Sequence, residues 1–130
     1  MTELLKAIQA KFDANATLRG LFPNGCFTTI AFREEPLPVC VLRIASNRPQ
    51  YNTGRAIVNN YSVRFTVFAE DGDLATQALD ALKAAFNEQA ISAATGTVLR
   101  STLTNEDIDV NDENVFQGEL FFDLWFQETI

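Results

Sequence analysis

The sequence contains no histidine and only two cysteines among its 130 residues. The missing histidine excludes Ser-His-Asp and Cys-His catalysis, most catalytic zinc sites and the commonest general base at neutral pH. Neither Cys26 nor Cys40 stands just before a predicted helix, whose N-terminus would lower a thiol pKa. Both lie in apolar, strand-like contexts, so we expect small core residues. The sequence also lacks the glycine-rich phosphate loops. We therefore expect no catalytic residues, no cofactor and no metal site.

Positive charge is scarce as well. The chain has ten Lys and Arg residues but 17 Asp and Glu residues, which gives a net charge of -7 and a sequence pI near 4.4. This balance argues against nucleic-acid binding and against a polybasic membrane anchor. No apolar run approaches the roughly 20 residues of a membrane helix, and the N-terminus is too polar for a secretory signal. We expect a single domain over residues 1–130, made and kept in a cytoplasm.

The spacing of apolar residues predicts two helices and five strands. Helices are expected at 2–15, capped by Thr2, and at 73–88, capped by Asp73, because leucine, alanine and phenylalanine recur there at intervals of three and four. Strands are expected at 26–32, 38–46, 55–69, 97–103 and 115–130. The order is α-β-β-β-α-β-β. Short turns favour antiparallel pairing, and two helices suffice to cover one sheet face. The fold class is α+β, a two-layer sandwich.

Two polar segments separate these elements. Residues 46–56 are rich in Asn, Pro and Gly, and we expect them to form a protruding loop. Residues 104–114 are acidic and begin like a calcium-binding EF-hand loop, with Asp107, Asp109 and Asn111 at positions 1, 3 and 5. The required Gly, the bidentate Glu and the flanking helices are all missing. The acidic segment is therefore expected to be a solvated connector.

The last strand is apolar on both sides. Leu120, Phe122, Leu124 and Phe126 fall on one face, whereas Phe121 and Trp125 fall on the other. Together with Phe68, the second face carries on the order of 500 Å² of aromatic surface. Soluble monomers seldom leave such a patch uncovered. A neighbouring subunit is the simplest cover, and the alternative is that loop 46–56 folds back over the face.

The order of these stretches resembles the tail terminator (tail-completion) proteins of long-tailed bacteriophages and prophages. The resemblance spans nearly the whole chain. It comprises the helix ELLKAIQAKFDANATLRGLF, the strand PLPVCVLRIAS, the connector NRPQYNTGR, the strand and helix YSVRFTVFAEDGDLATQALDALKAAF, and the closing FQGELFFDLWFQE. The strand-helix unit and the aromatic terminal strand are its most telling parts.

The resemblance implies a non-enzymatic virion protein of the tail or neck, assembled in the bacterial host cytoplasm. Such a protein forms a homo-oligomeric ring, hexameric in that family, which caps the tail tube and docks to the head-side connector protein. DNA passes through the ring without specific binding, and no membrane is involved. The candidate subunit or partner interface comprises Arg48, Tyr51, Asn52, Arg55, Phe68, Phe121 and Trp125.

Three other interpretations stay open on the sequence. A different neck component, such as a head-completion or head-tail joining protein, would show the same pattern. A small ligand-binding α+β module would use the uncovered sheet face as a pocket. An enzyme that relies on carboxylates alone is the third, although nothing singles out one pair among the 17 acidic residues.

Overall fold

The computed structural model of the protein describes residues 2–23, 25–28, 38–52, 55–94, 96–110 and 115–128. Within these ranges, residues 2, 50–52, 55–57 and 128 are described by their backbone alone. The helices are α1 (Thr2–Ala14), α2 (Ala16–Leu21) and α3 (Gly72–Phe86). The strands are β1 (Cys26–Phe27), β2 (Val39–Asn52), β3 (Arg55–Ala69), β4 (Ile91–Ala93), β5 (Gly96–Val110) and β6 (Phe116–Glu128).

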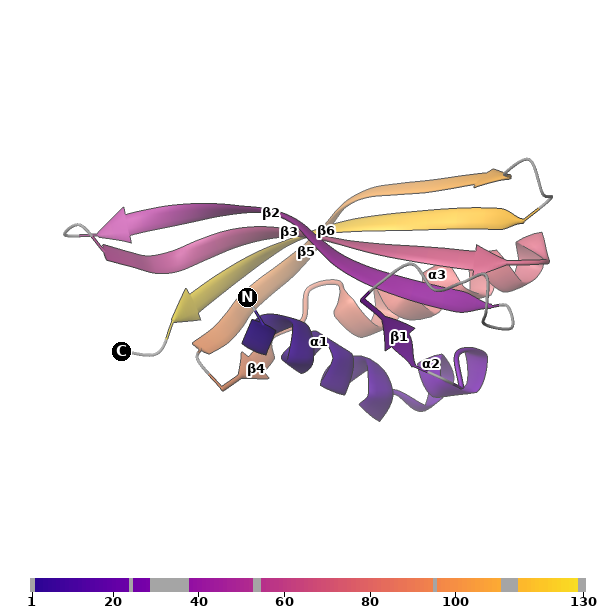
Figure 1. Cartoon of the computed structure of the whole chain (residues 1–130), viewed down its shortest axis with the longest axis horizontal. Coiled ribbons are helices and arrows are strands. Elements are labelled where there is room, and N and C mark those ends of the chain that lie inside the picture. The colour runs from indigo at the N-terminus through magenta and orange to yellow at the C-terminus, as the bar shows by residue number, and fades with distance from the viewer. Residues whose placement is uncertain are drawn as a thin grey trace.

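The strands form one sheet in the order β1-β2-β3-β6-β5-β4. Only the short pairing of β1 with β2 is parallel, and the other neighbours are antiparallel. The sheet twists strongly along its length, and the helices lie along one side of it (Figure 1). The predicted α+β class, with helices packed on one face of a mainly antiparallel sheet, is confirmed. The order differs because α2 and β4 are additional short elements.

The two long helices form where the apolar spacing predicts them. Leu4, Ile8 and Phe12 lie on one stripe of α1, and all three are buried. Helix α3 begins one residue earlier than predicted, at Gly72. Its N-cap is Asp71 rather than Asp73, because the Asp71 carboxylate accepts a hydrogen bond from the backbone N–H of Asp73 at 2.9 Å. The cap satisfies a donor that the first helical turn would otherwise leave unpaired.

A single apolar core lies between the helices and the sheet. The main apolar inward-facing side chains of β3 and β6 are all buried, and those of β6 are the four that the sequence places on one face of the last strand. The inward-facing set on the two strands comprises Tyr61, Val63, Phe65, Val67, Leu120, Phe122, Leu124 and Phe126. The Phe65 ring joins the layers, with its centroid 4.9 Å from that of Phe86 in α3 and 5.9 Å from that of Phe122 in β6. Cys40 is also part of this core, as predicted.

Both polar connectors are largely strand instead. Residues 46–52 continue β2, and β3 begins at Arg55, so the expected loop 46–56 is mostly the outer end of a paired hairpin. This hairpin extends the sheet beyond α1 (Figure 1). It therefore does not fold back over the sheet, and that alternative is wrong for the described residues. The acidic segment likewise continues β5 to Val110, paired with β6. Residues 29–32 of the expected strand 26–32 lie outside the described residues.

Candidate interaction face

The sheet has one face that the helices leave uncovered, which we call the outer face. Its residues alternate along the strands with those of the core. The outer face comprises Val39, Val41, Arg43, Ser46 and Arg48 of β2, Asn60, Ser62, Arg64, Thr66 and Phe68 of β3, Gln117, Glu119, Phe121, Asp123 and Trp125 of β6, and Asp107 and Asp109 of β5. Its exposed side chains are therefore available to a partner.

The three predicted interface aromatics lie on this face but do not form one patch. Phe68 is only 7% exposed, because it packs in a small cluster with Val39, Val41, Phe27 and Val115. Trp125 is 38% exposed and lies opposite Asn60. Phe68 lies opposite Gln117, and the eight residue-to-residue steps from Gln117 to Trp125 span about 27 Å of strand.

Phe121 lies between the two and is half-buried. The guanidinium carbon of Arg64 lies 5.9 Å from the centroid of its ring, which is within the range of a cation–π contact. Of the predicted hairpin residues, Arg48 is exposed on the outer face. The backbones of Tyr51, Asn52 and Arg55 pair at the end of the β2–β3 hairpin, but their side chains lie outside what the structure describes.

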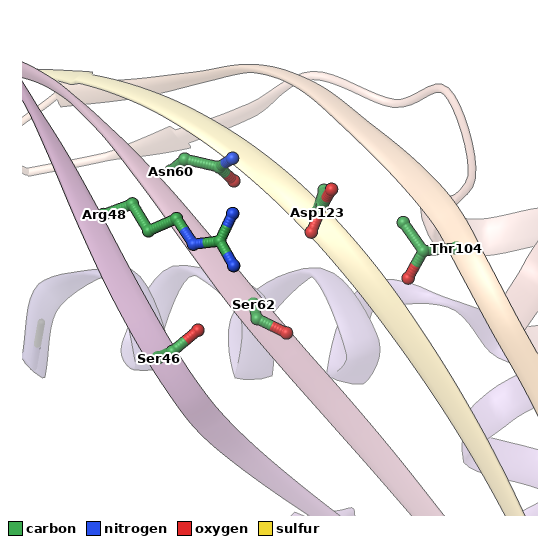
Figure 2. A pocket seen from close by; sticks show the side chains of 6 residues that line it. All are labelled: Ser46, Arg48, Asn60, Ser62, Thr104 and Asp123. Carbon is green, nitrogen blue, oxygen red and sulfur yellow. The ribbon is translucent and has the colours of Figure 1, made fainter.

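A polar groove crosses the outer face at its centre (Figure 2). It has a volume of about 210 Å³ and is lined by Ser46, Arg48, Asn60, Ser62, Thr104 and Asp123. The Arg48 side chain reaches from β2 across β3 toward the side of the groove that carries Asp123 (Figure 2). The Asn60 Oδ1 atom is buried and has no hydrogen-bond partner in the described part of the chain. This lining of charges, hydroxyls and an amide offers hydrogen bonds rather than the mainly apolar walls of a typical small-molecule site.

Arginines gather on the β2 and β3 side of the outer face. Arg43 and Arg64 lie directly opposite each other on the two strands. Two like charges in a directly opposite pair destabilise a sheet. Glu119 offsets part of this charge, because its carboxylate lies 3.9 Å from the Arg64 guanidinium. Arg43 and Arg48 form no ion pair among the residues that the structure describes.

Carboxylates gather on the β5 and β6 side of the same face. Asp107, Asp109, Gln117 and Glu119 line a hollow of about 130 Å³. Within the described ranges, no group of three or more His, Cys, Asp or Glu side chains has the arrangement of a metal site. The outer face is therefore divided by charge, with arginines toward β2 and carboxylates toward β5.

The two thiols are poorly suited to chemistry. Burial, reinforced by the nearby carboxylate of Asp13, raises the pKa of Cys26 to about 12. Burial also raises the pKa of Cys40 well above its ordinary value. Both cysteines are free thiols. Because the thiolate is the reactive form, neither is an activated nucleophile at neutral pH.

Comparison with known proteins identifies a chain of similar fold but no family. No protein-family model matches the chain, and no curated protein matches it significantly. A solved structure described as "Virion of native gene transfer agent (GTA) particle" contains a chain of the same fold, with a TM-score of 0.77. The two sequences are 14% identical, and the match covers 97% of this chain and 96% of that one. None of the described helices is both long enough and apolar enough to span a membrane.

Proposed function

We propose that this chain is a non-enzymatic structural protein of a phage-like virion. The observation that carries the proposal is the shared fold with a virion chain, because the match leaves almost no part of either chain unaligned. A fold by itself hosts many functions. Here the fold agrees with the independent resemblance of the sequence to virion tail proteins, and the two lines of reasoning use different information.

Within the virion, the proposed role is that of a tail terminator. Copies of the chain form a ring, hexameric in the family that the sequence resembles, which caps the tail tube and joins it to the head-side connector. The outer face supports a role in protein contact, since it presents exposed arginines, exposed aspartates and the exposed Trp125 indole. Tryptophan and arginine are the residue types most enriched at interface hot spots.

The acidic character of the chain suits a ring through which DNA passes. A net charge of -7 disfavours tight contact with phosphates, which proteins usually bind through Lys and Arg. Carboxylates facing a channel would repel the DNA backbone at distances up to about 10 Å at ordinary ionic strength. DNA would therefore pass without specific binding.

A second candidate is another neck component, such as a head-completion or head-tail joining protein. The virion match favours it equally, because that structure is a whole virion and the match does not distinguish one virion component from another. A third candidate, a small ligand-binding module, would use the polar groove at Arg48 and Asp123, although that groove lacks the mainly apolar walls of a typical small-molecule site. The three candidates differ in what the purified protein binds.

Binding to separated virion parts tests the proposal. Purified protein is added to tails, and separately to filled heads, from particles that lack this gene product, and both are imaged by negative-stain electron microscopy. A terminator forms a ring on one end of the tail tube and restores joining to heads. Binding to heads in the absence of tails would contradict the terminator role and favour the other neck component. Binding to neither part would contradict a virion role.

A further inference from the structure

The two cysteines of the chain are neighbours across a pair of strands. Cys26 is the first residue of β1 and Cys40 is the second residue of β2, and the parallel pairing of these strands sets the two directly opposite each other. Neighbouring strands lie about 4.8 Å apart, which is within the range of about 4.4–6.8 Å between the Cα atoms of a disulfide. The backbone therefore already holds the two residues at the separation that a disulfide requires.

Both side chains also lie on the same side of the sheet. Cys40 is fully buried in the apolar core, and Cys26 is partly buried and packs against the same core. The pKa of the Cys40 thiol is raised first by burial and then by the Cys26 thiol, as expected for two groups in proximity. The Cβ atoms therefore point in one direction from neighbouring backbones, which is the second geometric condition of a disulfide.

A covalent bond here would strengthen a contact that is short. In the described part of the chain, β1 pairs with β2 through only one further pair, Phe27 with Val41. On its other side, the Gln9 side-chain amide of α1 donates a hydrogen bond to the Cys26 carbonyl oxygen at 3.3 Å. Cys26 thus lies between the N-terminal helix and the sheet. A bond to Cys40 would join these two layers, and it would close the loop formed by residues 27–39.

We propose that Cys26 and Cys40 form an intramolecular disulfide when the protein meets an oxidising medium, with a small-molecule disulfide such as oxidised glutathione as the oxidant. The thiolate of the more exposed Cys26 attacks one glutathione sulfur, which forms a mixed disulfide and releases one glutathione. The Cys40 thiolate then attacks the Cys26 sulfur, which forms the internal bond and releases the second glutathione. The protein loses two electrons, the oxidant gains them, and both thiol protons end on the released glutathione molecules.

The burial of the thiols determines when this bond forms. Burial keeps both cysteines protonated at neutral pH, so exchange is slow and the bond needs long exposure to the oxidant. In a reducing cytoplasm the pair stays as two thiols. Under the proposed function, on which this timing alone rests, the assembled particle leaves the cell, and virion surfaces are among the places where disulfides persist. The bond would then stabilise the protein after assembly.

Peptide mapping after oxidation tests the disulfide. Reduced, purified protein is incubated with excess oxidised glutathione, the remaining thiols are alkylated in urea, and the protein is digested with trypsin without reductant. Cleavage at Arg19, Arg33 and Arg43 leaves the cysteines in separate peptides, 20–33 and 34–43. We expect one linked species of these two peptides, from protein of the monomer mass, that dithiothreitol separates. Recovery of only alkylated or glutathione-bound single peptides would overturn the proposal, as would a link between two chains.

Urea unfolding tests whether the folded structure favours the bond. The oxidised protein should unfold at a urea concentration higher by about 1 M or more than the reduced protein, because the link restricts the unfolded chain. Dithiothreitol should abolish this difference. Cys26→Ser is the matched control, since its unfolding midpoint should not respond to oxidised glutathione. An oxidised protein that unfolds at a lower urea concentration than the reduced one, or at the same concentration, would overturn the proposal. Both tests use a single chain in solution, so their failure leaves the virion function standing, whereas failure to bind tails or heads leaves the disulfide standing.

Discussion

Gly118 and Leu79 make the contact between β6 and α3 a sensitive test of the packing described here. A Cβ atom on Gly118 would lie 2.8 Å from the Leu79 Cδ1 atom and 3.0 Å from its Cδ2 atom. The Leu79 side chain is buried in the core, so a shift that makes room for the new methyl group would disturb its neighbours. We therefore expect Gly118→Ala to destabilise the protein by about 1–3 kcal/mol, the range typical of an overpacked core.

The Leu79→Ala change probes the same contact from the other side. Alone it should cost about 2–5 kcal/mol, because it removes buried methyl groups and leaves a cavity. In the double variant, the new methyl group at position 118 enters the space that the leucine vacates. The combined cost should fall short of the sum of the two single costs by about 1 kcal/mol or more, as expected for residues in direct contact.

Urea unfolding followed by circular dichroism gives the four free energies of this cycle. Gly20→Ala in α2 is the matched control, since a Cβ there meets nothing within 4 Å. It should raise stability by about 0.5–1 kcal/mol, the usual gain when alanine replaces a helical glycine. If the costs of the two single changes add up to the cost of the double change within about 0.5 kcal/mol, the contact between positions 79 and 118 is refuted.

Two further predictions test the thiols and the outer face. The pKa of Cys26 is raised from an ordinary 9.0 to about 12 in the folded protein. At pH 8 this thiol should therefore be alkylated about a thousandfold more slowly in the native protein than in urea, as measured by mass spectrometry. Equal rates in the two conditions would contradict its burial. Trp125→Asp should leave a soluble protein with cooperative unfolding, whereas Phe122→Asp should unfold the chain because a buried charge costs several kcal/mol. Loss of the native circular dichroism spectrum in Trp125→Asp would show that its face is core.

The sequence predicted the inner face of the sheet well because burial leaves a local signal. The alternation from Tyr61 to Val67 marks the core face of β3 directly, and the same holds from Leu120 to Phe126 in β6. The spacing in α3 identified its buried stripe for the same reason. The predicted N-cap of α3, Asp73, lies two residues after the observed one, Asp71, because aspartate is an equally good capping residue at either position.

The ends of the long strands could not be predicted, because pairing across the sheet decides them. Residues 47–52 have low strand propensity, yet they pair with β3, and the Asn47 side chain donates to Asn59 Oδ1 at 3.2 Å. Shifts of register after Ile44 and after Leu103 also interrupt the period-two pattern. Pro49 is tolerated because β2 is an open edge at that point in the described structure.

The candidate interface was only partly foreseen for a related reason. Counting aromatic side chains on one face predicted a single patch, but their positions along the strands separate Phe68 from Trp125. The charge division between β2 and β5 involves residues about 60 positions apart in sequence, and only the strand order brings them onto one surface. Arg48 is among the interface residues that the sequence predicts, whereas Arg43 is not, because only the strand pairing places it on the outer face opposite Arg64.

This distribution of charge and apolar surface bears on how the protein would assemble. A contact built on one large aromatic patch would be strong but also prone to association before the tail is complete. The outer face instead buries Phe68 within the chain and leaves Trp125 as its one large exposed aromatic among the described residues. The charge division of the outer face, with arginines toward β2 and carboxylates toward β5, favours one orientation of a partner that binds there. Under the proposed function, copies of the chain would stay soluble at low concentration and would form a ring where binding to the end of the tube raises their local concentration.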